Sequence, residues 1–413
     1  MFSLLFLLLF LSQPCQACTS AVVSGRATPD GRPLLWKNRD TDFLKNHIAY
    51  VKGERYDFIA NVNSATYPRL KEAWMGCNAA GFALMNTQSY NLMEMKEGEE
   101  RGAANGRVIH RALELCATVQ EFCHFLDTLQ KPSYIEANFG VIDARGGAAI
   151  LEVDYEGYTL YDANDPQTAP DGYLLRTNYS VCGRQDVGGG YVRQMEAERQ
   201  FPRLLKEEGI TPHAIFNHLS RSFNNCKLGI DLRDPYFNSS QSGGWFVDQD
   251  FIPRSSTSCS IVVQGTKKGE PGRLTTMWTL LGYPPTGVAV PLWVREPLPG
   301  MVRMDETLGC APLSHLSLQL ADVQVFCYKQ GIGTNRYLCW KNLYREDGSG
   351  LMQQAMLLED EILRLAQPFI RKWRKRGEIA DDELEKLYHS VAERLTSSSI
   401  YAKMRSSSSG WNQ

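Results

Sequence analysis

A cysteine directly behind a short apolar leader is the residue of this chain with the clearest potential for chemistry. Residues 2–11 are almost wholly apolar, and Pro14 is followed by Cys15-Gln16-Ala17 and then Cys18. Small residues at positions 15 and 17 fit the pattern at which signal peptides are cleaved, so we expect residues 1–17 to be removed. The mature chain would then begin with Cys18, whose free α-amine can serve as the base for its own thiol.

A predicted hairpin brings a polar stretch of the chain back beside this cysteine. Residues 19–24 and 33–36 are predicted strands, and Thr28-Pro29-Asp30-Gly31 between them is a strong turn signal. Folding about this turn brings the polar stretch Lys37-Asn38-Arg39-Asp40 back beside Cys18. A carboxylate at position 40 can hold an ammonium group in place, although capping of a turn is the simpler alternative for Asp40.

Composition and charge exclude several classes of function. The chain has 413 residues and a formal net charge of −2, which argues against a nucleic-acid partner. Beyond the leader, no apolar run approaches the ~20 residues of a membrane span, so we expect an exported protein, secreted or periplasmic, without stable membrane insertion. The seven histidines show no metal-ligand spacing, and we predict neither a metal nor a cofactor.

The cysteine count leaves disulfide pairing open. Nine of the eleven cysteines remain once Cys15 and Cys18 are set aside, and an odd number cannot pair completely within one chain. Because an exported protein can form disulfides, Cys310, Cys327 and Cys339 are the candidates. Cys116 and Cys123 lie on one face of a helix predicted over residues 106–129, where they suit a core better than a bridge.

The order of predicted elements indicates antiparallel sheets layered with helices. Strands are expected over 138–143, 149–153, 173–178, 258–264, 274–281 and 287–294, and helices over 191–208 and 212–222. From about residue 350 the chain is charged and helical, and a second helix is expected over 381–395. An apolar stripe on the first of these helices comprises Leu351, Met352, Met356, Leu357, Ile362, Leu363, Leu365 and Ala366.

Several short motifs, taken in order, carry a family resemblance. They are Cys18-Thr19-Ser20, the turn at 27–31, Trp36-Lys37-Asn38-Arg39-Asp40, the stretches 76–86 and 138–152, and Thr177-Asn178. Over about residues 18–295 the chain resembles N-terminal-nucleophile (Ntn) cysteine hydrolases of the choloylglycine hydrolase and penicillin V acylase superfamily, including the acyl-CoA:6-aminopenicillanic acid acyltransferase-like group. The resemblance implies an α+β fold, a four-layer αββα sandwich of antiparallel sheets. The catalytic domain would span 18–300, followed by a mainly helical extension, 301–413.

The resemblance also implies roles for individual residues. Cys18 would be the nucleophile and its α-amine the proton acceptor, with Asp40 holding the thiol or the amine. Asn86 and Asn178 match asparagines whose amides donate to the oxyanion, and such donors matter because acyl transfer builds negative charge on the carbonyl oxygen. Arg193 matches an arginine that supports the nucleophile. The alternatives are a turn role for Asn86 and an ordinary surface role for Arg193.

One position departs from the family pattern. Lys37 falls where bile-salt hydrolases carry an arginine, so the charge is kept but the planar hydrogen-bonding fork is lost. Arg39, two residues later, either supplies the missing guanidinium group or forms an outward ion pair. Lys37 is therefore a candidate site residue whose hydrogen-bond geometry differs from that of the family's arginine.

The function implied by the resemblance is that of an exported amidase or acyltransferase. It would cleave linear, non-peptide C–N amide bonds of a small-molecule substrate through a thioester on Cys18. A homo-oligomer is compatible with the resemblance. Two alternatives stay open: an exported Ntn dipeptidase, which also opens with Cys-Thr and an Asp-Gly turn, and a secreted binding protein that keeps the fold without catalysis, which the substitution at Lys37 supports.

Overall fold

The computed structural model describes residues 17–94, 102–239, 241–248, 250–328 and 337–402. The predicted signal peptide, residues 1–17, lies outside these ranges except for Ala17. Within the described ranges, no helix is both long enough and apolar enough to cross a membrane.

The first of two large sheets carries Cys18 on an inner strand. Its six strands follow the order β10-β1-β2-β14-β15-β16, and each neighbouring pair is antiparallel. Their bounds are β1 Cys18–Val23, β2 Leu34–Asp40, β10 Tyr173–Arg176, β14 Thr257–Gln264, β15 Thr276–Leu281 and β16 Val290–Leu292. Because β1 lies between β10 and β2, its position is fixed from both sides.

The second sheet is a meander in chain order. Its seven strands run β3-β4-β5-β6-β7-β8-β9, again with antiparallel neighbours. Their bounds are β3 Asn46–Val51, β4 Phe58–Asn63, β5 Met75–Asn78, β6 Ala83–Gln88, β7 Ala137–Ile142, β8 Ala148–Val153 and β9 Tyr158–Asp162. Two small two-stranded sheets pair β11 Asn224–Asn225 with β12 Ile230–Asp231, and β13 Trp245–Val247 with β17 Tyr337–Cys339.

The hairpin expected at the start of the chain is confirmed. Gly31 takes the left-handed conformation that the turn requires, with φ 70°. The hydroxyl of Thr28 donates to the carbonyl oxygens of Gly25 and Arg32 at 3.1 and 2.8 Å. In the resulting register Cys18 lies opposite Arg39. Local folding alone therefore places the polar end of β2 beside Cys18.

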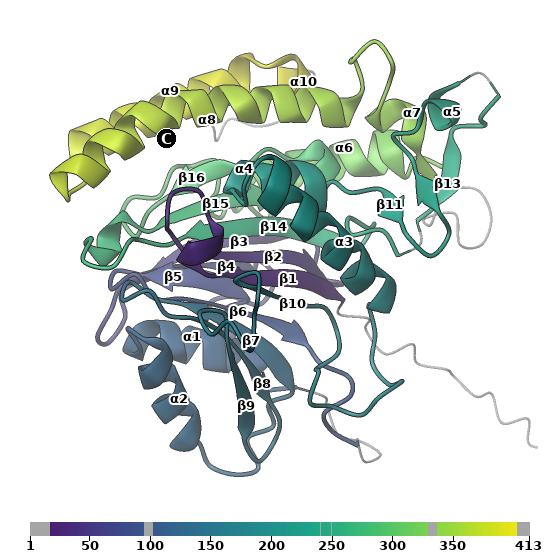
Figure 1. The fold of residues 1–413 in the computed structure, drawn as a ribbon. Helices are drawn as coiled ribbons and strands as arrows, with labels where there is room; N and C mark the ends of the chain where they lie inside the picture. The colour runs from purple at the N-terminus through teal and green to yellow at the C-terminus, as the bar shows by residue number, and fades with distance from the viewer. Residues whose placement is uncertain (1–16, 95–101, 240, 249, 329–336, 403–413) are drawn as a thin grey trace, which may run out of the picture.

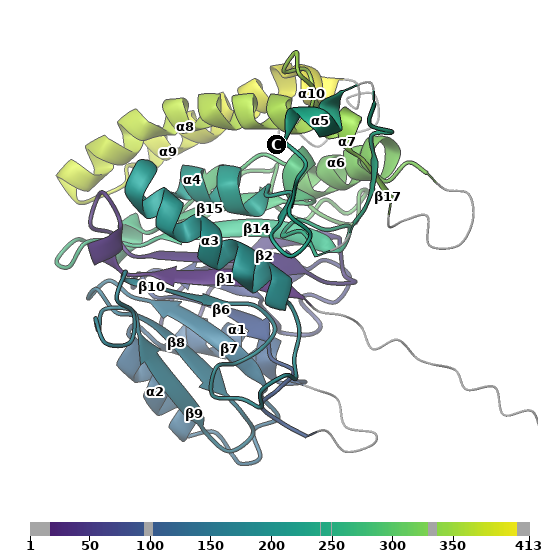
Figure 2. The same cartoon turned by 45° about the vertical axis from the view of Figure 1, so that its right-hand side comes forward.

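Helices cover the outer faces of both sheets (Figure 1). Their bounds are α1 Asn105–Leu115, α2 Val119–Asp127, α3 Tyr191–Glu207, α4 Pro212–Ile215, α5 Pro235–Asn238, α6 Pro312–Leu320, α7 Trp340–Leu343, α8 Leu351–Arg376, α9 Asp381–Ser397 and α10 Ser399–Ala402. α1 and α2 lie against the second sheet, whereas α3, α4 and α6 lie over the first sheet with α8 and α9 above them (Figure 2). The predicted α+β architecture, with two antiparallel sheets between helical layers, is confirmed.

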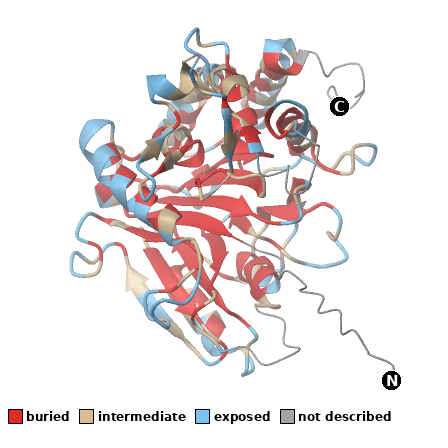
Figure 3. Ribbon diagram, turned by 90° about the vertical axis from the view of Figure 1, so that its right-hand side faces the viewer, coloured by how far each residue is buried: buried red, intermediate tan, exposed pale blue. Residues whose placement is uncertain are grey.

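Apolar burial follows these layers, and apart from the edge strand β9 the strands of both sheets are almost entirely buried (Figure 3). One hydrophobic cluster joins α1 and α2 to the outer face of the second sheet. A larger cluster runs from the space between the sheets through the first sheet to α8 and α9. Trp293, just after β16, packs edge-on against Trp373 of α8 with ring centroids 5.0 Å apart. The predicted domain boundary at residue 300 stays a prediction, and the helices beyond it share this larger core.

Two expectations about local structure were wrong. The helix predicted over 106–129 is two helices, because the Thr118 side chain accepts a hydrogen bond from the nitrogen of Glu121 and caps α2. Cys116 therefore lies just after α1 and Cys123 lies within α2, rather than both on one helix face. The described cysteines, including Cys310, Cys327 and Cys339, are free thiols, so the structure does not contain the suggested disulfides.

A buried ion pair attaches α8 to the rest of the molecule. Arg221 donates to both carboxylate oxygens of Glu359 at 3.0 and 2.7 Å, and both side chains are buried. Glu359 also accepts a hydrogen bond from the nitrogen of Ala289, and Arg221 donates to the carbonyl oxygens of Pro284 and Gly287. All the charge of this pair is thus matched within the protein.

Candidate active site

The backbone of Cys18, at the start of β1, is held by hydrogen bonds with two side chains. Its side chain is buried, with a relative exposure of 5% for the residue. Its nitrogen donates to Asn178 Oδ1 at 2.8 Å, and its carbonyl oxygen accepts from Arg193 Nη1 at 2.6 Å. The thiol sulfur lies 4.0 Å from the carbonyl oxygen of Asp40. Both ends of the Cys18 backbone are therefore fixed by side chains that are distant in the sequence.

The orientation of the Asn178 amide is fully determined. Asn178 Oδ1 accepts from the Cys18 nitrogen and from Arg193 Nη2 at 2.8 Å each, and Asn178 Nδ2 donates to the carbonyl oxygen of Gln88 at 2.9 Å. The amide oxygen thus faces the nitrogen of Cys18. This geometry suits Asn178 as an anchor for that nitrogen, while its expected role as an oxyanion donor stays a prediction.

Arg193 reaches the site from α3, which covers the outer face of the first sheet. In addition to Cys18 and Asn178, its guanidinium group donates to Thr19 Oγ1 at 2.9 Å. The helix begins after Gly190, whose φ is 81°, and a Cβ atom there would lie 2.4 Å from Arg193 Nη2. A glycine before α3 is therefore required for Arg193 to turn back toward β1, and the surface alternative for Arg193 was wrong.

Asp40 is buried at the end of β2, but its carboxylate contacts other residues than Cys18. Asp40 Oδ2 accepts from Arg254 Nε and Nη2 at 3.1 and 2.9 Å, and Asp40 Oδ1 accepts from Thr257 Oγ1 at 2.6 Å. The recorded contact with Cys18 is made by the Asp40 carbonyl oxygen. A direct hold of the Asp40 carboxylate on the thiol or the amine therefore stays a prediction.

Lys37 and Asn86 connect the two sheets. Lys37 Nζ, from β2, donates to Asn86 Oδ1 of β6 at 2.9 Å and to the carbonyl oxygen of Trp74 at 3.0 Å. Because an ammonium group only donates, it fixes the Asn86 oxygen toward itself and leaves the Asn86 N–H groups for another acceptor. Burial lowers the pKa of Lys37 to about 8, a change that a negative charge on Cys18 opposes and Arg39 reinforces.

Arg39 lies between two cysteines on the face of the first sheet that meets the second. Its strand neighbours in register are Cys18 on β1 and Cys259 on β14. Its guanidinium group donates to Asn63 Oδ1 at 2.6 Å and is 4.9 Å from the ring centroid of Trp74. Burial lowers the pKa of Arg39 and raises the pKa of Cys259 to about 11. The outward ion-pair alternative for Arg39 was therefore wrong.

Three buried cations, Lys37, Arg39 and Arg193, surround Cys18, and we refer to them as the cation cluster. Their recorded hydrogen-bond acceptors are amide, carbonyl and hydroxyl oxygens, all of them neutral. Within the described ranges, no ion pair joins any of the three to a carboxylate. Positive charge therefore accumulates beside the thiol, where it can stabilise an oxyanion that forms during a reaction.

The structure thus groups the six sequence-predicted residues around the first sheet, with Asn86 reaching Lys37 from the second sheet, and it adds residues that the sequence did not reveal. Arg254 and Thr257 hold Asp40, yet they lie more than 200 residues from it in the chain. Gln88 and Asn63 come from the second sheet. No local pattern signals these four residues, because each reaches the site through pairing of distant strands or through contact between the sheets.

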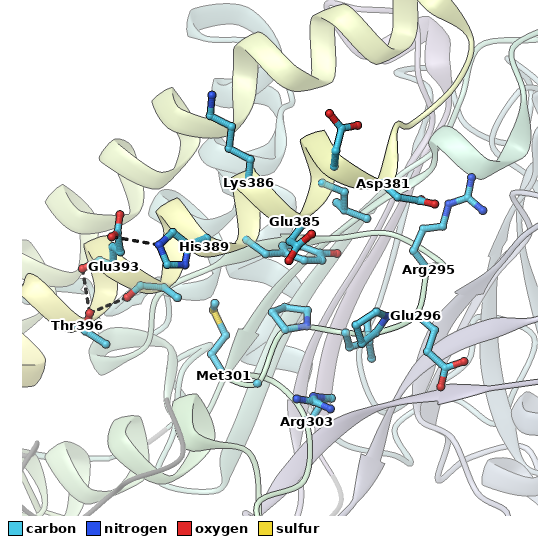
Figure 4. Close-up of a pocket in the computed structure, with 18 residues that line it drawn as sticks. Arg295, Glu296, Met301, Arg303, Asp381, Glu385, Lys386, His389, Glu393 and Thr396 are labelled. Atoms are coloured by element: carbon cyan, nitrogen blue, oxygen red, sulfur yellow. Dashed lines mark hydrogen bonds and ion pairs between the residues drawn. The ribbon is translucent and has the colours of Figure 1, made fainter. Parts of the chain in front are cut away.

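A separate cavity of about 980 Å³ lies away from these residues, between the segment 295–303 and α9 (Figure 4). Leu298, Met301 and Leu384 contribute apolar surface there. His389 at its rim is paired with Glu393 at 3.2 Å. The cavity contains no cysteine and none of the predicted site residues.

Two antiparallel sheets lie between helical layers, and Cys18 is the first residue of an inner strand with Asn178 on its nitrogen, which is the arrangement expected from the resemblance to Ntn hydrolases. Residues 26–208 match the family model of acyl-coenzyme A:6-aminopenicillanic acid acyl-transferase. Over residues 26–208 the chain is therefore similar to this family, in agreement with the resemblance of its sequence. No curated protein matches the chain.

Solved structures that match part of this chain include three enzymes. A Caenorhabditis elegans N-acylethanolamine-hydrolyzing acid amidase ortholog is 16% identical with a TM-score of 0.40, covering 59% of this chain and 92% of that one. A variant of conjugated bile acid hydrolase from Clostridium perfringens is 11% identical with a TM-score of 0.39, covering 67% and 92%. Penicillin V acylase from Agrobacterium tumefaciens is 15% identical with a TM-score of 0.36, covering 67% and 86%.

Proposed function

We propose that the mature protein is an exported amidase or acyltransferase that cleaves linear C–N amide bonds through a thioester on Cys18. The observation that carries the proposal is the contact of the Cys18 nitrogen with Asn178 Oδ1. Once residues 1–17 are removed, this nitrogen becomes the α-amine, and Asn178 is positioned to hold it next to the thiol of the same residue.

The reaction would proceed in two balanced halves. The Cys18 thiol gives its proton to the α-amine, and the sulfur attacks the amide carbonyl carbon. The tetrahedral intermediate then releases the amine, which takes the proton from the Cys18 ammonium group as the C–N bond breaks. Water, or an acceptor nucleophile in a transferase, attacks the thioester while the α-amine removes its proton, and the acyl product leaves with the thiol restored.

Two residues are suited to stabilise the oxyanion. The Asn86 N–H groups are available because Lys37 occupies the Asn86 oxygen. Lys37 also adds a positive charge in a buried environment, where electrostatic interactions are stronger than in water. Preorganised donors of this kind contribute about 3–4 kcal/mol each to transition-state stabilisation.

The test uses mature protein that starts at Cys18. Cys18→Ala is expected to abolish turnover of a panel of N-acyl amides, and mass spectrometry of the wild-type protein quenched during turnover is expected to show an acyl adduct on residue 18. The same panel, extended to dipeptides, separates the amidase from the dipeptidase alternative. Full turnover by Cys18→Ala would overturn the proposal. Correctly folded wild-type protein that turns over nothing and forms no adduct would favour a binding protein.

Cleavage after Ala17 and export are parts of the same proposal and have their own measurement. N-terminal sequencing of the exported protein is expected to start at Cys18 with a free amine. A chain that starts elsewhere and retains full activity would contradict the assignment of the α-amine as the base.

A further inference from the structure

Glu152 is a buried carboxylate of the second sheet that has no part in the proposed reaction. It lies on β8, and its relative exposure is 1%. Its Oε1 atom accepts hydrogen bonds from Arg176 Nε at 2.6 Å and from the Val181 nitrogen at 2.7 Å, and its Oε2 atom accepts one from the Cys182 nitrogen at 2.8 Å. One carboxylate therefore binds three donors that all belong to residues 176–182, which we call the Asn178 segment.

The three donors lie on both sides of Asn178 in the chain. Arg176 is the last residue of β10 and precedes Asn178, whereas Val181 and Cys182 follow it. Hydrogen bonds to an ionised acceptor are shorter and stronger than neutral ones. Glu152 therefore fixes both ends of the segment that carries Asn178.

Neutral side chains hold the middle of the Asn178 segment against the second sheet. Asn138, the cross-strand neighbour of Glu152, donates to the carbonyl oxygen of Tyr179 at 3.0 Å and accepts from the hydroxyl of Ser180. Asn91 Oδ1 accepts from the Ser180 nitrogen at 2.7 Å, and Asn91 Nδ2 donates to the Ser180 carbonyl oxygen at 2.8 Å. The segment is thus attached to the second sheet, although the side chain of Asn178 contacts Cys18 on the first.

The contacts of Asn178 with the first sheet depend on an accurate position of this segment. Asn178 Oδ1 accepts from the Cys18 nitrogen and from Arg193 Nη2 at 2.8 Å each. Because such hydrogen bonds tolerate only a few tenths of an ångström in length, a shift of about 1 Å in the segment would weaken both. Groups that take part in catalysis must be held within about 0.5 Å of their productive geometry. The residue that fixes the segment therefore bears directly on the nitrogen of Cys18.

We propose that Glu152 is a positioning residue of the active site, which fixes Asn178 and, through Asn178, the α-amine of Cys18 by holding both ends of the Asn178 segment. The inference rests on the proposed function, because it assumes that this nitrogen becomes the base. Arg176 extends the arrangement to the first sheet: it lies opposite Ser20 of β1, and its carbonyl oxygen accepts from Ser20 Oγ at 2.9 Å.

The effect of Glu152 is one of geometry rather than of charge. Its carboxylate forms an ion pair with Arg176 at 2.6 Å, and the side-chain exposures of the two residues are 0% and 7%. The two opposite charges therefore largely cancel at the distance of Cys18. Loss of the carboxylate should act on the reaction by releasing the Asn178 segment, and this consequence can be tested separately from a change in charge.

The first experiment replaces the carboxylate by an amide of the same shape in mature protein. In Glu152→Gln one acceptor oxygen becomes a donor, so the three donors can no longer all be bound. We expect kcat for an N-acyl amide to fall by roughly 10- to 100-fold, with the Michaelis constant within about threefold. The matched control is Asp143→Asn, because Asp143 is equally buried and accepts from three main-chain nitrogens at the β7–β8 hairpin. An equal fall of kcat in the control would contradict the inference.

A double-mutant cycle tests whether Glu152 acts through Asn178. Two residues that work as a unit have non-additive effects, so Glu152→Gln introduced into Asn178→Ala should change kcat by less than about twofold. A purely structural or electrostatic role of Glu152 would not depend on the side chain at position 178. The same fall of kcat in both backgrounds would therefore overturn the inference.

A second variant leaves every charge in place and serves if Glu152→Gln does not fold. Val181→Pro removes the main-chain N–H that donates to Glu152 Oε1. Val181 is 59% exposed and is the second residue of a turn closed by a hydrogen bond from the Gly183 nitrogen to the Ser180 carbonyl oxygen, a position that suits proline. We expect kcat to fall by about 3- to 10-fold. Unchanged kcat in folded Val181→Pro would contradict the role of Glu152.

Alkylation of Cys18 by iodoacetamide separates this inference from the proposed function, because it needs no substrate. Mass spectrometry of the N-terminal peptide measures its rate in mature protein. Alkylation should be several-fold slower in Glu152→Gln than in wild type or Asp143→Asn, since a displaced α-amine removes the thiol proton less well. Equal alkylation rates would overturn the role of Glu152 alone. Absence of amide turnover and of an acyl adduct in folded wild type would instead refute the proposed function, whatever the alkylation rates.

Discussion

Two sets of buried arginines in this protein differ in whether a carboxylate is hydrogen-bonded to the guanidinium group. Arg221, under α8, is paired with the carboxylate of Glu359 and two carbonyl oxygens, so its charge is fully matched. Arg39 and Arg193, beside Cys18, make hydrogen bonds only to neutral oxygens. Burial lowers the pKa of both site arginines. The difference indicates that the first arrangement serves stability, whereas the second leaves positive charge available for a reaction.

The largest expected effect breaks the stabilising pair. Glu359→Ala leaves the buried charge of Arg221 without a counter-ion, and loss of one partner of such a pair costs about 3–5 kcal/mol. We expect a clear fall in the midpoint of thermal unfolding, measured by calorimetry. The matched control is Glu361→Ala on the same helix, where a half-exposed ion pair with Arg394 is worth under about 1 kcal/mol. Equal changes in the two variants would contradict the comparison.

The next effect concerns activity rather than stability. Asn86→Ala removes the amide that Lys37 orients, and loss of one oxyanion donor lowers kcat by about 100- to 1000-fold. The Michaelis constant should change much less, because the interaction is made mainly in the transition state. Steady-state kinetics on mature protein measures both constants. Asn342→Ala, at a partly exposed asparagine of α7, is the control, and a similar loss there would discredit the role of Asn86.

Removing the charge of Asp248, a buried carboxylate near the site, should raise stability, whereas removing Glu359 should lower it. Burial raises the pKa of Asp248 to about 6, and its Oδ1 has no hydrogen-bond partner within the described residues. The folded state therefore holds the proton more tightly than the unfolded state between about pH 4 and 6, and stability falls as the pH rises through this interval. Asp248→Asn should raise stability at pH 7.5 by about 1–3 kcal/mol and have little effect at pH 4.

Thermal unfolding at the two pH values measures this effect. Asp42→Asn, at an exposed aspartate, is the control and should be neutral at both pH values. A loss of stability at pH 7.5 in Asp248→Asn would show that the charged form of Asp248 is needed in the fold.

The smallest predicted effect is a pH dependence. Burial lowers the pKa of Lys37 to about 8, so its charge is lost as the pH rises above that value. The charged or titratable groups that face it are Cys18, Arg39, Cys259 and Asp40. Loss of this charge should lower kcat by up to about tenfold between pH 7 and 9, because Lys37 orients the Asn86 amide and supports the oxyanion. Lys37→Arg should remove this fall, since arginine stays charged. A fall that persists in Lys37→Arg would assign the effect to another group.

The parts of the site that follow from local sequence were predictable. The turn at Asp30-Gly31 sets the register of β1 and β2, so Lys37 and Asp40 could be placed beside Cys18 from the sequence alone. Arg254 could not, because its contact with Asp40 depends on the pairing of β2 with β14, strands separated by more than 200 residues. The role of Gly190 was also hidden, since it depends on the path that Arg193 takes back to β1.

The same distinction applies to the helical extension. Hydrophobic periodicity correctly predicted the helix over α8 and the burial of Met352, Ile362 and Ala366. It misplaced Leu357 and Leu365, which are exposed. The polar Glu359 takes an inward position instead, because the buried Arg221 requires a carboxylate there. A sequence pattern read on one helix cannot reveal a charge that belongs to another element.

The strand order β10-β1-β2-β14 has a consequence for biosynthesis. Cys18 is synthesised before Arg193, Arg254 and Thr257, which all lie at least 175 residues later in the chain. β14 cannot be added to the edge of β2 until residue 264 has left the ribosome. The surroundings that position Cys18 and Asp40 are therefore completed only after β14 has been synthesised, although Cys18 is made long before it.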